Sequence, residues 1–485
     1  MNGALILFII AAYFGLLLLI SYFTGRKNSG NEAFFLGNRR SPWYIVSIAM
    51  IGTSLSGVTF VSVPGLVGSI DMTYMQTVFG FFVGYILIAK VLLPLYYRLR
   101  LTSIYAYLEE RIGRRAYRTG ASFFLLSKIT GAAARLYLVT LILQTYVFGA
   151  WNVPFGATVL ISIALVWLYT FRGGVRTIVW TDTLQCICFI SMLAIIIWEV
   201  KNKMGADVPD MVHRLTESSY FRIFEFDDWH STQHFAKQFF SGIFITIVMT
   251  GLDQDMMQKN LSCKSLKDAQ KNMYTYGFAF APVNFLFLSL GALLLILASS
   301  KHIPLPENLQ GDDLLPFFCT SGLLGDSILI FFTIGIIAAA FSSADSALTA
   351  LTTSFCVDIL GVEKKEAAEA QRIRRRVHLL MSVLFALIIL LFKALNSRSV
   401  IDAIYLIASY TYGPLLGLFA FGLFTKKQPR DALVPFICLA SPLICLAAGY
   451  LARRYAGYTF SYEMLMINGG LTFAGLWFAS RNTVK

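Results

Sequence analysis

Long apolar stretches recur along the whole chain and are separated by shorter polar segments. Many of them reach about 18 residues, which is long enough for one helix to cross roughly 30 Å of hydrocarbon. The pattern predicts an all-α polytopic membrane protein with about thirteen transmembrane helices, at 4–23, 43–63, 74–96, 120–148, 154–171, 178–199, 236–256, 273–299, 326–359, 378–395, 400–424, 433–452 and 460–480.

The composition agrees with a membrane protein. Hydrophobic residues make up 57% of the chain and charged residues only 14%, whereas soluble domains are roughly one quarter charged. The longest predicted loop, about 200–235, contains no composition shift that would indicate a soluble domain. We therefore interpret residues 1–485 as a single transmembrane domain.

The net charge of +13 raises the possibility of a nucleic-acid partner, but the positions of the basic residues are better explained by membrane topology. Basic residues concentrate in the predicted loops 97–119 and 360–377, and such loops face the cytoplasm. The basic residues near the N-terminus follow the first apolar run, so we predict a retained span and not a cleaved signal peptide. We expect a multi-pass protein of the cell inner (plasma) membrane, with no nucleic-acid partner, the N-terminus outside and the C-terminus cytoplasmic.

Two predicted spans are interrupted by small and polar residues. In the second span these are Gly52, Thr53, Ser54, Ser56, Gly57 and Thr59, and in the seventh they are Gly251, Asp253 and Asp255. Interrupted helices at matching places in two halves point to a transport site between inverted repeats. The repeats would be 43–199 and 236–424, with 1–42 and 433–485 peripheral. A packing face of small residues is the alternative explanation for the second span.

Polar residues also share one face of the ninth predicted span. Ser342, Asp345 and Ser346 follow the helical spacing that places side chains on one side. A carboxylate at mid-membrane is costly unless it is paired, protonated or solvated. Hydroxyl and carboxylate oxygens suit a hard cation such as Na⁺. Asp182, in the sixth span, would share this cation if the two spans touch; alternatively it stabilises a helix N-terminus.

Two further residues are candidates for binding a solute. Arg135 lies well inside the fourth span, and its planar guanidinium matches a carboxylate in a bidentate manner. A structural pair with an acid on another helix is the alternative. Gln76, at the start of the third span, would offer amide hydrogen bonds to a polar solute or would lie at a helix interface.

The chain resembles the solute:sodium symporter family along nearly its whole length. The resemblance rests on "FFLGNRRSPWYIVSIAMIGTSLSG", "WTDTLQ" and "AAAFSSADSAL". It implies the LeuT-type five-plus-five inverted repeat. It also implies one Na⁺ held by the carbonyls of Gly52, Leu55 and Ala339 with the hydroxyls of Ser342 and Ser343.

Some bacterial members, including sialic acid transporters, resemble the chain more closely than other members do. By that resemblance a second Na⁺ would bind Asp182, Ser342, Asp345 and Ser346. Where those relatives are expected to carry serine, this chain has Asp345, so a proton or an outward-turned packing residue remains an alternative. The resemblance further implies a solute pocket formed by Arg135, Ser54, Ser56, Thr59 and Gln76.

The resulting hypothesis is a Na⁺-coupled symporter that imports a sugar, an acidic sugar or another organic acid by alternating access. It is not an enzyme, and its partners are Na⁺, the solute and the lipid bilayer. The substrate alternatives are an amino acid or a vitamin. From other classes, a passive channel remains open, and an intramembrane aspartyl protease using Asp182 and Asp345 lacks the Gly-x-Gly-Asp context that such enzymes contain.

Overall fold

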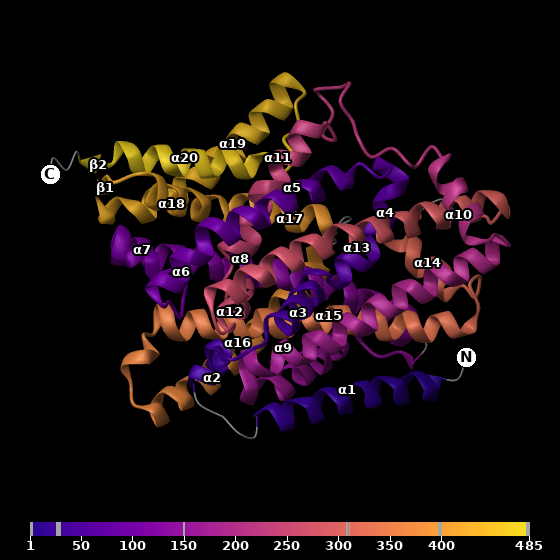
Figure 1. Cartoon of the computed structure of the whole chain (residues 1–485), viewed down its shortest axis with the longest axis horizontal. Helices are drawn as coiled ribbons and strands as arrows, with labels where there is room; N and C mark the ends of the chain where they lie inside the picture. The colour runs from indigo at the N-terminus through magenta and orange to yellow at the C-terminus, as the bar shows by residue number, and fades with distance from the viewer. Residues whose placement is uncertain are drawn as a thin grey trace.

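The computed structural model of the chain describes residues 3–25, 31–148, 151–306, 309, 311–395 and 400–481. Helices form a bundle in which α1 lies along one side and α19 and α20 along the opposite side (Figure 1). The helices of the first half are α1 (Gly3–Gly25), α2 (Asn31–Leu36), α3 (Trp43–Ser54), α4 (Gly57–Ile70), α5 (Tyr74–Leu87), α6 (Leu93–Leu99), α7 (Ala106–Arg111), α8 (Arg114–Leu143), α9 (Phe155–Met204) and α10 (Val208–Thr216).

The second half repeats this helical character and ends in a small sheet. Strands β1 (Gln428–Pro429) and β2 (Ser480–Arg481) pair antiparallel, with Gln428 opposite Arg481. The helices are α11 (Phe235–Thr246), α12 (Gln254–Leu261), α13 (Leu266–Ser300), α14 (Leu314–Thr320), α15 (Asp326–Ser354), α16 (Ala367–Leu395), α17 (Val400–Thr411), α18 (Gly413–Phe424), α19 (Val434–Ala456) and α20 (Met464–Phe478).

Among the described residues, seven helices are long and apolar enough to cross a membrane, and two bent helix pairs raise the number to nine. Four shorter apolar helices accompany them, at 10–24, 155–171, 413–424 and 464–478. All of these coincide with predicted spans. The total of thirteen crossings stays a prediction, because length and composition alone do not place a helix across the bilayer.

The predicted fifth and sixth spans, 154–171 and 178–199, correspond to the two helical parts of α9, which meet directly at Gly174, where the backbone is not helical. Gly174 has φ 51° and ψ −142°, a conformation that residues with a Cβ rarely adopt. A Cβ there would also lie 2.5 Å from the Phe34 carbonyl oxygen. The kink thus depends on glycine both for its backbone angles and for the close contact with α2.

Elements that are distant in sequence meet at the centre of the bundle. Helix α3 packs against α9, and α15 packs against both α9 and α8 (Figure 1). The polar face of α15 is buried there: Ser342, Asp345 and Ser346 are each at most 1% exposed. Because these hydroxyls and carboxylates face protein and not lipid, the fold allows them to form a polar site at membrane depth.

Candidate cation and solute site

The two predicted interruptions are real bends in the chain. Helices α3 and α4 meet at 58° across Leu55 and Ser56, and the segment 235–251 meets α12 at 63°. No residue that the structure describes donates a hydrogen bond to the Leu55 carbonyl. At the second bend, the Asp253 carboxylate accepts hydrogen bonds from the backbone N–H of Asp255 (2.9 Å) and of Met256 (3.3 Å), which begins α12. Both bends therefore expose backbone or carboxylate oxygens inside the bundle.

The bend between α3 and α4 touches α15, as the first predicted cation site requires. Ser343 Oγ lies 3.3 Å from the Thr53 carbonyl oxygen and 3.4 Å from that of Ala339. Gly52, one residue before Thr53, packs so tightly on α9 that a Cβ would lie 2.8 Å from the Asp182 carbonyl oxygen. The structure thus brings the α3 break, α9 and the hydroxyl face of α15 together.

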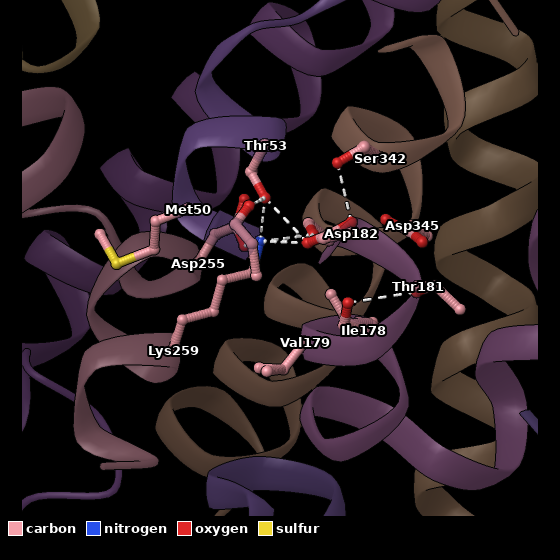
Figure 2. Close-up of polar contacts among 12 residues, drawn as sticks. Met50, Thr53, Ile178, Val179, Thr181, Asp182, Asp255, Lys259, Ser342 and Asp345 are labelled. Atoms are coloured by element: carbon pink, nitrogen blue, oxygen red, sulfur yellow. Dashed lines mark hydrogen bonds and ion pairs between the residues drawn. The ribbon is translucent and has the colours of Figure 1, made fainter. Parts of the chain in front are cut away.

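Asp182 is the centre of the polar network (Figure 2). It is fully buried, and Ser342 Oγ donates to its Oδ1 at 2.8 Å. Ser346 Oγ (3.1 Å) and Thr53 Oγ1 (2.8 Å) donate to its Oδ2. Asp182 therefore joins the α3 break to α15. It does not act as a helix N-terminal acid, since it lies eight residues after the break at Gly174, beyond the first turn of the helix that follows.

A buried lysine that the sequence interpretation missed completes this network. Lys259 Nζ donates to Asp182 Oδ2 (2.7 Å) and to Thr53 Oγ1 (Figure 2). It also donates to Ser346 Oγ (2.7 Å). The sequence predicts that the seventh span ends at 256, which would leave Lys259 as one of many loop charges. A usable signal was the Asp255–Lys259 spacing of four residues, which pairs side chains on a helix.

Asp345 faces the interior, so the expectation of an outward-turned packing residue is wrong. It is fully buried, and Tyr169 OH on α9 donates to its Oδ2 at 2.9 Å. Its Oδ1 has no hydrogen-bond partner. Asp345 lies beside Asp182 (Figure 2). The two remaining interpretations are that Asp345 Oδ1 binds a cation or that it carries a proton.

A polar cavity of about 110 Å³ opens beside the two bends. Ser54, Ser56, Thr59 and Arg135 line it, as the solute-site prediction requires. Aromatic side chains form much of the remaining wall, and Ser54 Oγ is 2.5 Å from the hydroxyl of Tyr276. The ion-paired Lys128 and Asp253 also line the cavity. Hydroxyls, aromatic rings and a few charged groups are typical of a pocket for a small polar organic molecule.

Arg135 reaches this cavity without an ion-pair partner. It is half-buried on α8, and no described residue makes a hydrogen bond or ion pair with it. Lys128, two turns earlier on the same helix, is instead paired with Asp253 Oδ1 (3.2 Å) and Asp255 Oδ2 (2.8 Å). The structure therefore favours the solute-binding interpretation of Arg135 over a structural pair.

Gln76 is the one predicted solute ligand that the structure does not bring to the cavity. Its Nε2 donates to the Gln233 carbonyl at 2.8 Å, and its Oε1 accepts from the Glu225 N–H at 3.0 Å. The residue is fully buried and does not line the cavity. Both ends of the amide are occupied by the long loop, so the structure favours the alternative of an interface residue.

The sequence model of the sodium:solute symporter family matches residues 34–435. The chain belongs to this family. It is 26% identical to the sodium/sialic acid symporter NanT of Aliivibrio fischeri over 87% of this chain and 83% of the relative. It is 24% identical to the sodium/sialic acid symporter SiaT of Proteus mirabilis over 91% and 89%.

Two solved structures show the fold of this family member. A substrate-bound, outward-open Na⁺-coupled sialic acid symporter matches with a TM-score of 0.83, 20% identity and 98% coverage of both chains. Mhp1, a nucleobase-cation-symport-1 family transporter, matches with a TM-score of 0.60, 13% identity and 93% and 94% coverage. The fold is the LeuT-type fold predicted from the sequence. The division into repeats at 43–199 and 236–424 stays a prediction.

Proposed function

We propose that the protein is a Na⁺-coupled symporter that imports a small carboxylated solute, of the acidic-sugar class, by alternating access. Its membership of the sodium:solute symporters supports Na⁺ coupling, and the two sialic acid symporters among its relatives support an acidic sugar. The observation that carries the proposal is the unpaired guanidinium of Arg135 in the polar cavity.

The charge distribution around the cavity explains why a carboxylate would bind there. The Lys128 ammonium is neutralised by Asp253 and Asp255, so it offers no free charge to a solute. Arg135 has no such partner, and a guanidinium can donate two parallel hydrogen bonds to a carboxylate. Ser54, Ser56 and Thr59, which line the same cavity, would bind the hydroxyl groups of the solute.

Na⁺ binding would act on the bend that forms part of the cavity. The proposed ligands are the carbonyls of Gly52, Leu55 and Ala339 with the hydroxyls of Ser342 and Ser343. A cation among these oxygens ties the α3 break to α15 and orders Ser54 and Ser56, which line the solute pocket. Ion and solute then favour the same conformation, and this shared preference couples their movements.

The exchange between outward-open and inward-open states would follow from the fold. In proteins of this architecture, one helix bundle rocks against the other around a fixed site at the broken helices. We place the protein in the plasma membrane with the N-terminus outside, because the basic loops near 97–119 and 360–377 then face the cytoplasm.

The geometry gives little support to the two functions from other classes. An aspartyl protease needs two adjacent carboxyl groups that share a proton, but Asp182 is instead paired with Lys259. A passive channel does not require a carboxylate clamp such as Arg135. Import of an amino acid or a vitamin is distinguished from import of an acidic sugar by the transport assay.

The test is uptake into proteoliposomes that contain the purified protein. A labelled panel of sialic acid, neutral hexoses, monocarboxylates, amino acids and vitamins is measured with an inward Na⁺ gradient and with choline in its place. We expect concentrative uptake of a carboxylated solute only with Na⁺. Equal uptake with choline would refute Na⁺ coupling, and transport restricted to neutral solutes would refute the carboxylate assignment.

A further inference from the structure

The surroundings of the Lys259 amine are those of a cation site. Its three N–H groups donate to the Asp182 carboxylate and to the hydroxyls of Ser346 and Thr53. Asp255 Oδ1 lies 3.7 Å from the amine, and Asp182, Thr53 and Asp255 surround it in Figure 2. The residue is 1% exposed. A lysine ammonium has three donors and no acceptor, so every donor is satisfied. Its neighbours are hard oxygen atoms of the kind that coordinate an alkali cation.

These oxygens overlap with the predicted second Na⁺ site. That site was expected to use Asp182, Ser342, Asp345 and Ser346. The amine bonds directly to two of the four, Asp182 and Ser346. A Na⁺ bound to the same two oxygens would lie next to a positive charge in a fully buried site, where like charges repel more strongly than in water.

The charged groups around the two bends support the same conclusion. The acids are Asp182, Asp253, Asp255 and Asp345, and the bases are Lys128, Arg135 and Lys259. Lys128 is paired with both Asp253 and Asp255, and Lys259 is paired with Asp182. Asp345 alone makes no ion pair with any described residue, and its Oδ1 is unpartnered. Four acids and three bases leave one net negative charge before a solute binds, and one mobile cation is enough to balance it.

We propose that the Lys259 ammonium permanently fills the second cation site as a tethered cation, so that one Na⁺ and not two accompanies each solute. The proposal rests on the Na⁺ coupling inferred above. Lys259 belongs to α12, the second half of a broken span, and its contacts tie that helix to α3, α9 and α15. The Lys259 amine would thus hold α12 against these three helices, as a second bound ion would, but it would not be released during transport.

The first test measures Na⁺ binding alone, so it does not depend on knowing the solute. The purified protein is titrated with NaCl at constant ionic strength with choline, and thermal stability is followed, because a ligand that binds only the folded state raises stability with its concentration. We expect the wild type to fit one site, with a Hill coefficient near one. Two cooperative sites in the wild type would overturn the proposal.

Substitutions then test whether the amine occupies the site. Lys259→Ala should open it, and a second Na⁺ should bind, so that the Hill coefficient rises towards two. Lys259→Arg keeps the positive charge and should stay near one. Asp182→Asn in the Lys259→Ala background should remove the new site and return the coefficient to one. An unchanged single site in a folded Lys259→Ala protein would contradict the proposal.

A membrane-potential experiment provides a reading from the wild type that does not depend on folding of the variants. One Na⁺ with a monocarboxylate such as sialic acid moves no net charge, so accumulation should not respond to an imposed potential. Two Na⁺ would move one net charge, and 100 mV would then increase accumulation by about 50-fold. Such a response to the potential would overturn the single-ion proposal but not the proposed function. If the wild-type protein bound no Na⁺ in the titration, the proposed function would be overturned as well.

Discussion

Replacing Arg135 by Gln should selectively weaken the binding of carboxylated solutes. The guanidinium is half-buried, has no partner among the described residues and lines the polar cavity. Glutamine keeps a planar polar group but loses the charge and the two-pronged donor arrangement. A carboxylate bound by Arg135 would therefore lose both its charge interaction and one of its paired hydrogen bonds.

The size of the effect follows from the environment of the guanidinium. Opposite charges 4 Å apart attract by about 4 kcal/mol at an effective dielectric constant near 20. A hydrogen bond to a charged group contributes about 1.5–3 kcal/mol. Because these describe the same interaction, we expect a loss of about 3–4 kcal/mol, which corresponds to an increase of about 100- to 700-fold in the KM for uptake.

The assay compares an acid with its uncharged isostere. Uptake of a labelled acidic sugar and of its carboxamide is measured in proteoliposomes with an inward Na⁺ gradient. The wild type should strongly prefer the acid, and Arg135→Gln should transport both similarly. Arg135→Lys, which keeps the charge without the planar fork, should be intermediate, at about a 10-fold increase in KM.

The matched control is Arg214→Gln, because Arg214 is exposed and pairs with Asp210 on the same helix at 2.7 Å. Exposed pairs of this kind contribute little, about 0–1 kcal/mol, so uptake should be unchanged. If Arg135→Gln retains the wild-type preference for the acid, Arg135 does not bind the carboxylate and the solute site has been assigned incorrectly.

Three further predictions concern the ion site, the bend and the long loop. Ser342→Ala should raise the Na⁺ concentration for half-maximal uptake about 5- to 10-fold, since a lost neutral hydrogen-bonding group costs about 1–1.5 kcal/mol; unchanged Na⁺ dependence would exclude Ser342 as a ligand. Gly57→Ala would place a Cβ 2.2 Å from Val139 Cγ2, so we expect about 1–3 kcal/mol of destabilisation in thermal unfolding, partly reversed by adding Val139→Ala; no rescue would mean that this contact is not the cause. Gln76→Leu should lower thermal stability and leave the KM for solute unchanged, because the Gln76 amide makes hydrogen bonds with the loop at Glu225 and Gln233. A large change in KM with normal stability would instead show that Gln76 belongs to the solute site.

Local patterns in the sequence were enough to predict the helices and their interruptions. Each apolar run is a property of consecutive residues, and the clusters at Gly52–Gly57 and Gly251–Asp255 mark where helical hydrogen bonding fails. The spacing of Ser342, Asp345 and Ser346 likewise determines a shared helix face whatever that face touches. The resemblance of whole motifs to a known family then supplied the fold and the pairing of α9 with α15.

The contacts of individual charges were decided only by the tertiary structure. Nothing near Lys259 in the sequence indicates that its amine reaches Asp182, which is 77 residues away. The kink at Gly174 likewise depends on its close contact with α2. The side-chain amide of Gln76 makes its hydrogen bonds with a loop about 150 residues later in the chain. A buried charge is stabilised by whatever oxygen atoms the packed helices bring within 3 Å of it, and residues distant in the chain supply those atoms.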